Sequence, residues 1–234
     1  MSIKIKTSIY LLILILLTQV SCDIKEEGDK TKIYSEEFYN VFVIKKDEMN
    51  FGVSLSKPED ADFYVNSNFF NKEDKPIGLV VINRLRHSVR KSGGGYFYVL
   101  NNRPFVSSLY CPTMTDFASQ SLLWAINDGV KNEDLFHKKH AKKNVYRTLL
   151  GLNSKGDIIV VSSNRVGFVS IKEIVEYAEK IGVIEGILLD GGSSVDYKFT
   201  TSDDEISFQS LPNYLKKSLK ISQPTTYIYG NYKS

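Results

Sequence analysis

The stretch Gly186-Ile187-Leu188-Leu189-Asp190-Gly191-Gly192-Ser193-Ser194 places one acidic residue directly after an apolar run and before two glycines and two serines. An apolar run of this length, 183–189, predicts a buried strand. Paired glycines permit positive φ and a close approach of the backbone to a ligand. We therefore expect Asp190 at the end of a core strand, beside hydroxyls and backbone N–H groups. The spacing alone leaves a plain Asp-Gly turn between two strands as an equal alternative.

A predicted helix precedes this strand. Ser170 and Glu173 have the spacing of a capping box, apolar residues follow on one helical face, and Gly182 ends the pattern. Two predicted strands, 145–152 and 157–163, come before the helix. A strand, a helix and a second strand in succession put Asp190 at the carboxyl end of its strand, where sheets commonly display polar groups for ligands.

The rest of the chain is rich in short strands and turns. Its 234 residues are 42% hydrophobic, which suits one domain with a real core. We predict an α+β fold in a single domain, with a mixed, mostly antiparallel multi-stranded sheet and a few packed helices. Residues 116–130 are compatible with either helix or strand. Further strands are predicted at 38–44, 50–55, 78–82, 96–100, 104–109 and 225–229.

The N-terminus has the pattern of a targeting segment. Lys4 and Lys6 precede an apolar stretch, 9–17, that is too short for a comfortable membrane span. The pattern looks like a bacterial lipoprotein signal in which Cys22 becomes the lipidated first residue. We therefore predict a signal peptide at 1–21, a tether at 22–35 and a folded domain at 36–234. The expected location is the cell envelope, with the protein exported and anchored to the membrane through lipid on Cys22.

Several functional classes are disfavoured. A net charge of +3 is too small to indicate nucleic-acid binding. Cys111 would be the lone cysteine beside a lipidated Cys22, so we expect a buried small residue and no disulfide. His137 and His140 lack a second ligand pair, so we expect exposed loop histidines and predict no metal. We also predict no cofactor. The basic run 84–91 is expected to be a solvated loop, with an anion site as the alternative.

Four groups of polar residues stand within otherwise apolar strands and are candidates for a site. Arg147 is the most informative, because a guanidinium is costly to bury without an anionic partner. Asp190 could be that partner in a structural ion pair, or a ligand phosphate or carboxylate could be held bidentately. The four groups are Asn66 with Asn68, Arg147 with Thr148, Asn164 with Arg165, and Asp190 with Ser193 and Ser194.

The order of four segments resembles the phosphodiester glycosidase domain family, which includes the enzyme that uncovers mannose 6-phosphate and bacterial relatives associated with exopolysaccharide. The upstream stretches 65–70 and 120–129 are similar to family motifs as well. The four segments are YRTLLGL at 146–152, GDIIVV at 156–161, GFVSIKE at 167–173 and LLDGGSS at 188–194.

This resemblance implies hydrolysis of a sugar-1-phosphodiester or a related glycan linkage. Arg147 would hold the phosphate, and Asp190 would act as nucleophile or as general base for water. Asp196 is a candidate second carboxylate, although we favour an exposed strand position for it. The predicted substrate-binding residues are Asn66, Asn68, Gln120, Thr148, Asn164, Arg165, Gly191, Gly192, Ser193 and Ser194.

Two other functions stay open at this point. The chain could be a non-catalytic surface lipoprotein that binds glycan in the same cleft. It could also be a structural protein in which Arg147 and Asp190 form only a buried ion pair.

Overall fold

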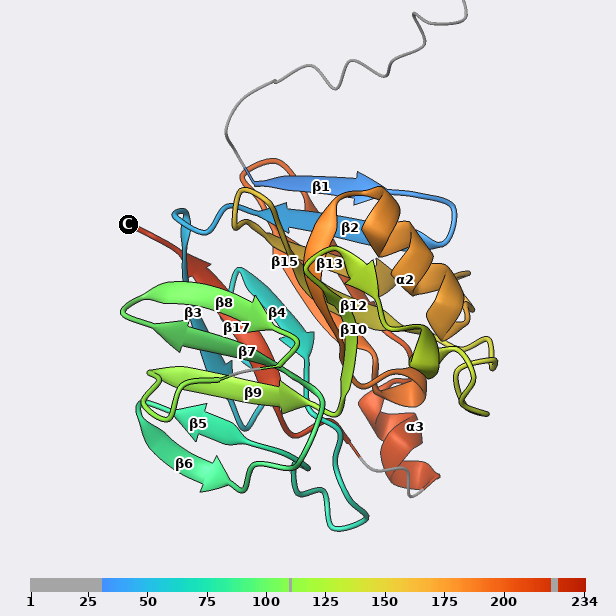
Figure 1. The fold of residues 1–234 in the computed structure, drawn as a ribbon, viewed down its shortest axis with the longest axis horizontal. Coiled ribbons are helices and arrows are strands. Elements are labelled where there is room, and N and C mark those ends of the chain that lie inside the picture. The colour runs from blue at the N-terminus through green and yellow to red at the C-terminus, as the bar shows by residue number, and fades with distance from the viewer. Residues whose placement is uncertain (1–30, 110, 220–222) are drawn as a thin grey trace, which may run out of the picture.

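A computed structural model describes residues 31–109, 111–219 and 223–234. The predicted signal peptide and Cys22 lie outside these residues. Within the described part of the chain, three antiparallel sheets and two α-helices make up the fold (Figure 1). None of the helices described is long and apolar enough to cross a membrane.

The largest sheet has seven strands in the order β1-β2-β13-β12-β14-β10-β11. Its edge strand β1 takes up Lys32–Ser35, so the sheet extends four residues into the predicted tether. The other strands are β2 (Tyr39–Ile44), β10 (Leu123–Asn127), β11 (Val130–Lys131), β12 (Thr148–Asn153), β13 (Ile158–Ser163) and β14 (Val183–Leu188).

Two five-stranded sheets complete the fold. The first has the order β16-β15-β4-β17-β3 and the second has the order β6-β5-β9-β7-β8. Their strands are β3 (Met49–Ser54), β4 (Phe63–Asn66), β5 (Val80–Ile82), β6 (Leu85–Ser88), β7 (Gly95–Leu100), β8 (Arg103–Ser107), β9 (Phe117–Ser121), β15 (Asp196–Thr200), β16 (Glu205–Gln209) and β17 (Tyr227–Tyr232).

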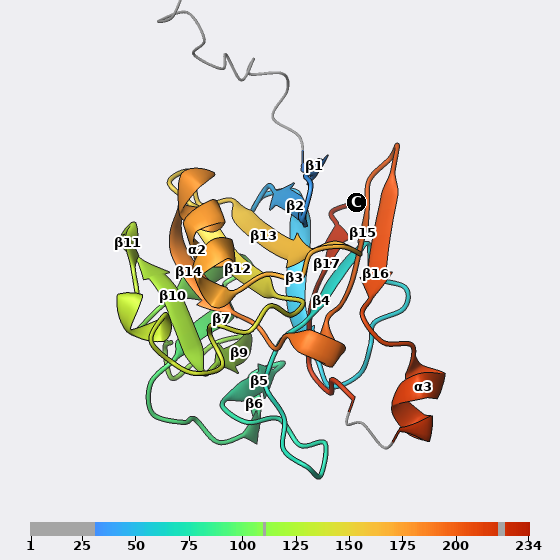
Figure 2. The same cartoon turned by 90° about the vertical axis from the view of Figure 1, so that its right-hand side faces the viewer.

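Helix α2 (Ile171–Lys180) covers one face of the seven-stranded sheet (Figures 1 and 2). The predicted capping box is formed, with Glu173 N donating to Ser170 Oγ and Ser170 N donating to Glu173 Oε2. Ile174 and Val175 on the apolar face of this helix are fully buried against the sheet. The opposite face of the sheet packs on the two smaller sheets through a second apolar cluster, which includes Phe42.

The antiparallel part of the fold prediction is confirmed, and the mixed part is wrong. Every strand pairing among the described residues is antiparallel, and helices are scarcer than an α+β fold implies. Residues 116–130 form β9, β10 and β11 with no helix. Strands β13 and β14 do run parallel to each other, because each pairs antiparallel with β12, which lies between them.

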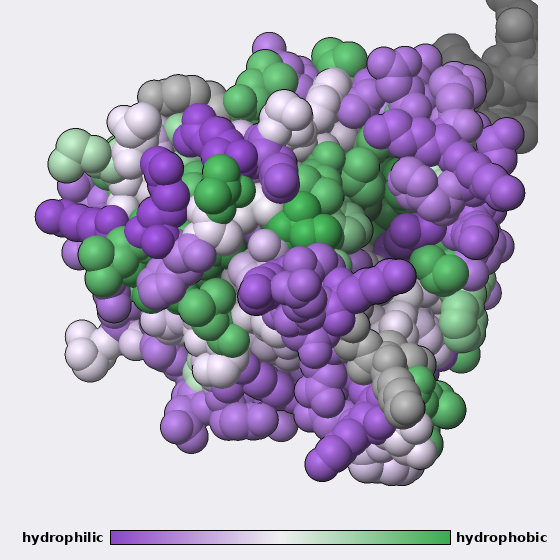
Figure 3. Space-filling view, turned by 90° about the horizontal axis from the view of Figure 1, so that it is seen from below, coloured by the Kyte–Doolittle hydropathy of each residue, from purple (hydrophilic) through white to green (hydrophobic). Residues whose placement is uncertain are grey.

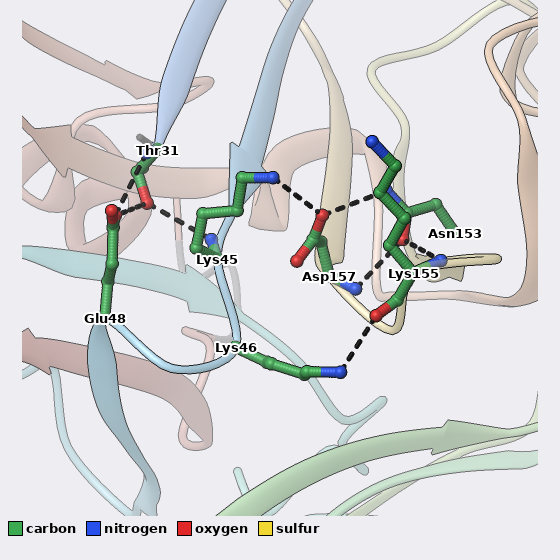
Figure 4. Close-up of polar contacts among 7 residues, drawn as sticks. All are labelled: Thr31, Lys45, Lys46, Glu48, Asn153, Lys155 and Asp157. Carbon is green, nitrogen blue, oxygen red and sulfur yellow. Dashed lines mark hydrogen bonds and ion pairs between the residues drawn. The ribbon is translucent and has the colours of Figure 1, made fainter. Parts of the chain in front are cut away.

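The hairpin turn between β12 and β13 is tied to the turn between β2 and β3 (Figure 4). Asn153 Oδ1 accepts hydrogen bonds from the backbone N–H groups of Lys155 and Asp157, at 2.9 Å each, which closes the predicted turn. Lys45 Nζ lies 3.2 Å from Asp157 Oδ2. This ion pair holds the far end of the sheet, away from the residues of the predicted site.

Cys111 is fully buried, as predicted. Burial raises the pKa of its thiol to about 11, so it is a poor nucleophile. The basic run 84–91 includes an exposed edge strand, β6, where a loop was predicted. Arg90 in this run donates to the Cys111 carbonyl at 2.7 Å.

Candidate active site

Arg147 and Asp190 are brought to the same edge of the seven-stranded sheet. Arg147 directly precedes β12, and Asp190 follows β14 by two residues. The two strands pair antiparallel, so the start of one lies beside the end of the other. Leu189 N donates to the Thr148 carbonyl at 3.0 Å, which extends the pairing to the site itself. The predicted convergence of the two residues is therefore confirmed.

The loop after Asp190 is fixed by backbone contacts. Gly192 N donates to the Tyr146 carbonyl at 2.8 Å. A Cβ on Gly191 would lie 2.7 Å from that same carbonyl oxygen, so only glycine fits there. Gly192 adopts φ +64°, which glycine tolerates without strain. Gly191 is thus required for the loop to pass this close to Tyr146, and Gly192 provides the positive φ of the next residue.

The backbone of Asp190 is anchored on its other side by β4 and the residue after it. Asn66 Nδ2 donates to the Asp190 carbonyl at 2.9 Å, and Asp190 N donates to the Ser67 carbonyl at 3.0 Å. These contacts leave the carboxylate as the part of Asp190 that is available for chemistry.

The Asp190 carboxyl has an unusual proton affinity. Burial raises its pKa from 3.8 to about 6, against hydrogen bonds from the Ser194 hydroxyl and the Gly191 N–H that lower it. The positive charges of Lys216 and Arg147 also lower it. A carboxylate with a pKa near 6 is a stronger base than an exposed aspartate and is still ionised at neutral pH.

The Arg147 guanidinium is held in place by backbone oxygens. Its Nη2 donates to the carbonyls of His140 and Lys143 at 2.9 and 3.0 Å. Its Nε is buried and has no hydrogen-bond partner among the described residues. Burial lowers the pKa of Arg147, and the charge of Asp190 opposes this.

No ion pair within 4.0 Å joins Arg147 and Asp190 in the part of the chain that is described. The predicted alternative of a direct structural ion pair is therefore not formed. The guanidinium keeps hydrogen-bonding capacity that its own backbone partners do not use.

Both residues line one pocket of about 460 Å³. Seen from below, the molecule is hollowed over a hydrophobic surface that hydrophilic side chains surround (Figure 3). The pocket combines apolar walls with three basic side chains and one carboxylate. Its lining residues are Phe69, Leu122, Leu123, His140, Lys143, Val145, Arg147, Ile171, Leu188, Leu189, Asp190, Gly191 and Gly192.

His140 and Lys143 were not predicted as site residues. Both are exposed in the loop before β12, as a polar loop should be, yet both line the pocket. Partial burial of the imidazole, and then the charge of Arg147, lower the pKa of His140 below its ordinary value. The signal that could have found them is their proximity to Arg147 in the sequence, which His140 precedes by seven residues and Lys143 by four.

Four residues that were predicted to bind the sugar are buried, which contradicts that role. Asn66 and Gln120 have no exposed surface, Thr148 has none, and Asn68 is 1% exposed. Their polar groups are used inside the protein: Gln120, for example, accepts from Leu79 N and donates to the Lys91 and Gly93 carbonyls. These side chains hydrogen-bond to groups inside the protein around the pocket, and none of their polar atoms is free to contact a substrate.

Only some of the remaining predicted residues line the pocket of Asp190. Gly191 and Gly192 line the pocket, and Ser193 is exposed without lining it. Ser194 is buried, and its hydroxyl donates to the Asp190 carboxylate. Asn164 and Arg165 line a separate groove with Tyr197 and Phe208, so they do not join the pocket of Asp190.

Asp196 is not an exposed strand residue, and that prediction is wrong. It is 2% exposed, and its carboxylate is fully engaged. Lys57 Nζ lies 3.1 Å from Oδ1, and the Tyr227 hydroxyl donates to Oδ2 at 3.2 Å. Strand β15 lies between β16 and β4 in its sheet, so Asp196 is not on an edge strand. Asp196 therefore does not serve as a second carboxylate in the pocket.

A family profile described as phosphodiester glycosidase matches residues 59–215. No curated protein matches the chain. The fold is similar to that of the zebrafish N-acetylglucosamine-1-phosphodiester alpha-N-acetylglucosaminidase catalytic domain, auto-inhibited by pro-peptide, with a TM-score of 0.63 and 13% identity over 87% of this chain and 82% of that chain. It is also similar to a hypothetical protein from Synechocystis, with a TM-score of 0.56 and 12% identity over 87% of this chain and 61% of that chain. At these identities the likeness to solved structures concerns the fold.

Proposed function

Because the chain belongs to the phosphodiester glycosidase family, we propose that it hydrolyses a sugar-1-phosphodiester in the pocket lined by Arg147 and Asp190. In this reaction the bond between the anomeric carbon and the phosphate oxygen breaks. Water supplies the oxygen that replaces it, and the phosphate monoester leaves. The observation that carries the proposal is that one pocket joins a guanidinium and a carboxylate without a direct ion pair between them.

The charges of the pocket suit such a substrate. A phosphodiester carries one negative charge, and Arg147 and Lys143 offer positive charge on the wall of the pocket. The Arg147 guanidinium is oriented by two backbone carbonyls before any ligand arrives, so little ordering is needed on binding. Asp190, with its raised pKa, would act at the anomeric carbon as nucleophile or as the base that activates water.

The apolar walls of the pocket also suit this substrate. Leu122, Leu123 and Leu189 lie beside the two charged groups. Apolar walls exclude water and strengthen the interaction of a charged group with a bound phosphate. The sugar ring has an apolar face that such walls can accept.

The direct test is the release of sugar from an N-acetylglucosamine-1-phosphodiester, the linkage named for the similar zebrafish enzyme. We expect turnover by the unmodified protein and a loss of about 100-fold or more in kcat/KM for Asp190→Asn, the size typical of removing an essential group. Arg147→Met should lose a similar factor. Asp203→Asn, which changes an exposed aspartate, is the matched control. Full activity of Asp190→Asn would remove Asp190 from the mechanism.

A non-catalytic glycan-binding function remains the second candidate because of one observation. Asp190 is the single carboxylate among the described residues that line the pocket. Glycosidases usually pair two carboxylates. A phosphodiester is already a good leaving group, so a second acid is less necessary for this substrate. Saturable binding of the phosphodiester with no product after long incubation would favour the binding function.

We also propose that the protein acts in the cell envelope, held by lipid on Cys22. The support is the signal-like segment before Cys22 in the sequence. Replacing Cys22 by alanine should move the protein from the membrane fraction to the soluble fraction. An unchanged distribution would contradict the anchor.

A further inference from the structure

A second pocket lies beside the short helix α3 (Asn213–Ser218), at the lower right of Figure 1. Its volume is about 630 Å³, and it shares no lining residue with the pocket of Arg147 and Asp190. Lysine is its commonest lining residue. The lining residues are Leu55, Ser56, Lys57, Glu59, Lys72, Asp74, Asn213, Lys216, Lys217, Gln223, Pro224, Thr225 and Tyr227.

Lys216 is the unusual member of this set. It has no exposed surface, and its Nζ is buried with no hydrogen-bond partner among the described residues. A lysine ammonium has three donors, and burying it unpaired is costly. Thr225 lines the same pocket, and its Oγ1 is also buried without a partner in the described part of the chain. Two unsatisfied donors at one pocket indicate a missing acceptor.

The neighbouring carboxylate does not supply that acceptor. Asp196 Oδ1 is paired with Lys57 Nζ, and Asp196 Oδ2 accepts a hydrogen bond from the Tyr227 hydroxyl. The charge of Asp196 acts on Lys216 from a distance, as does that of Asp190. Lys57 opposes both. No lining carboxylate therefore pairs with Lys216, whose buried ammonium stays without a direct partner among the described residues.

The rim of the pocket does not change this balance. Lys72 and Lys217 are exposed there, and so are Glu59 and Asp74. Two positive and two negative exposed charges offset one another and are screened by salt. The Lys216 ammonium is the charge without a direct partner, and screening by salt is weakest at its buried position.

We propose that this second pocket binds a phosphate-type oxyanion, with Lys216 Nζ and the Thr225 hydroxyl as its donors. Lys57 adds a positive charge nearby. The proposal does not rest on the proposed hydrolysis, because the two pockets share no lining residue, although the charge of Lys216 also acts on Asp190. The oxyanion can be free phosphate or the phosphoryl group of a sugar phosphate.

Equilibrium dialysis of the full-length protein against radiolabelled inorganic phosphate tests the proposal. We expect Lys216→Met to weaken binding at this site by about tenfold or more, as the loss of a charge-assisted hydrogen bond should. Lys217→Met is the matched control, because it removes the same charge from the adjacent, exposed position of the same helix. That control should change affinity by about twofold or less.

The active-site pocket can also take phosphate, so the two sites are separated by variants. Arg147→Met should leave the site at Lys216 intact, and Lys216→Met should leave the site at Arg147 intact. A second titration with glucose 1-phosphate distinguishes the sources: tighter binding than inorganic phosphate assigns the site to a sugar-borne group, and equal binding assigns it to phosphate itself.

Thermal unfolding supplies a check that does not depend on stoichiometry. Phosphate should raise the Tm of the unmodified protein and of Arg147→Met, and raise it less in Lys216→Met. Without phosphate, Lys216→Met should be at least as stable as the unmodified protein, because an unpaired ammonium has been removed from the interior. Equal loss of binding in Lys216→Met and Lys217→Met, or binding that disappears entirely with Arg147→Met, would overturn the proposal.

Discussion

Replacing Asp190 by asparagine should stabilise the protein at neutral pH and leave its stability unchanged in acid. Burial raises the pKa of this carboxyl from 3.8 to about 6. The folded protein therefore binds a proton that the unfolded chain has released, over the interval between these two values. Stability falls as pH rises through this interval, since the folded state binds more protons than the unfolded state. An asparagine does not titrate in this range, so the variant keeps its free energy of unfolding as pH rises.

The magnitude follows from the same two values. The interval from 3.8 to about 6 corresponds to about 3 kcal/mol when each tenfold step is worth about 1.4 kcal/mol. Partial solvent contact makes this an upper bound, so we expect a gain of about 1–3 kcal/mol above pH 7. The hydrogen bonds from Ser194 and Gly191 can still be accepted by the asparagine Oδ1. The substitution thus removes the charge and little else.

Urea unfolding at pH 3.5 and at pH 7.5 measures this effect. The difference in the free energy of unfolding between Asp190→Asn and the unmodified protein should be near zero at the lower pH and positive at the higher pH. Asp203→Asn, at an exposed position, should show no difference at either pH. A gain that is the same at both pH values, or a loss at pH 7.5, would refute the account of Asp190 as a carboxyl whose pKa is raised by burial.

Three other predictions follow from the site. If Asp190 acts as a carboxylate, kcat/KM should increase as pH rises through about 6, and a decrease over that range would exclude this role. Gly191→Ala should cost about 1–3 kcal/mol in urea unfolding, because its Cβ would lie 2.7 Å from the Tyr146 carbonyl oxygen. Gly186→Ala, whose Cβ would find its nearest neighbour at 3.4 Å, should cost less. Asn66→Ala should lower the free energy of unfolding by about 1–3 kcal/mol, because two backbone groups lose buried partners, and an unchanged value would show that Asn66 is not an anchor.

The sequence by itself determined the local elements around Asp190. The capping box at Ser170, the apolar face of α2 and the end of β14 were all predicted within a residue or two of where they lie. These features depend on residues that are near one another in sequence, namely a cap and a periodic apolar pattern. The family likeness rested on the same local motifs, and the profile match over 59–215 agrees with it.

The tertiary structure decided which of the polar residues meet. Asn66 and Gln120 look like ligands in the sequence, yet β4 and β9 carry them into the interior, where their amides satisfy the backbone. Asp196 looked like an exposed strand residue, yet it is buried, with Lys57 and the Tyr227 hydroxyl on its carboxylate. Period-two alternation says that a side chain lies on one face of a strand, but it does not say what covers that face.

The same distinction applies to the stretch that ends at Asp190. Its strand, its two glycines and its carboxylate could be read from the residues themselves. Its partner Arg147 is 43 residues earlier and reaches it only because β12 and β14 pair antiparallel in one register. Pairing between distant strands depends on the whole core and not on any local pattern, so the geometry of the site was a property of the tertiary structure.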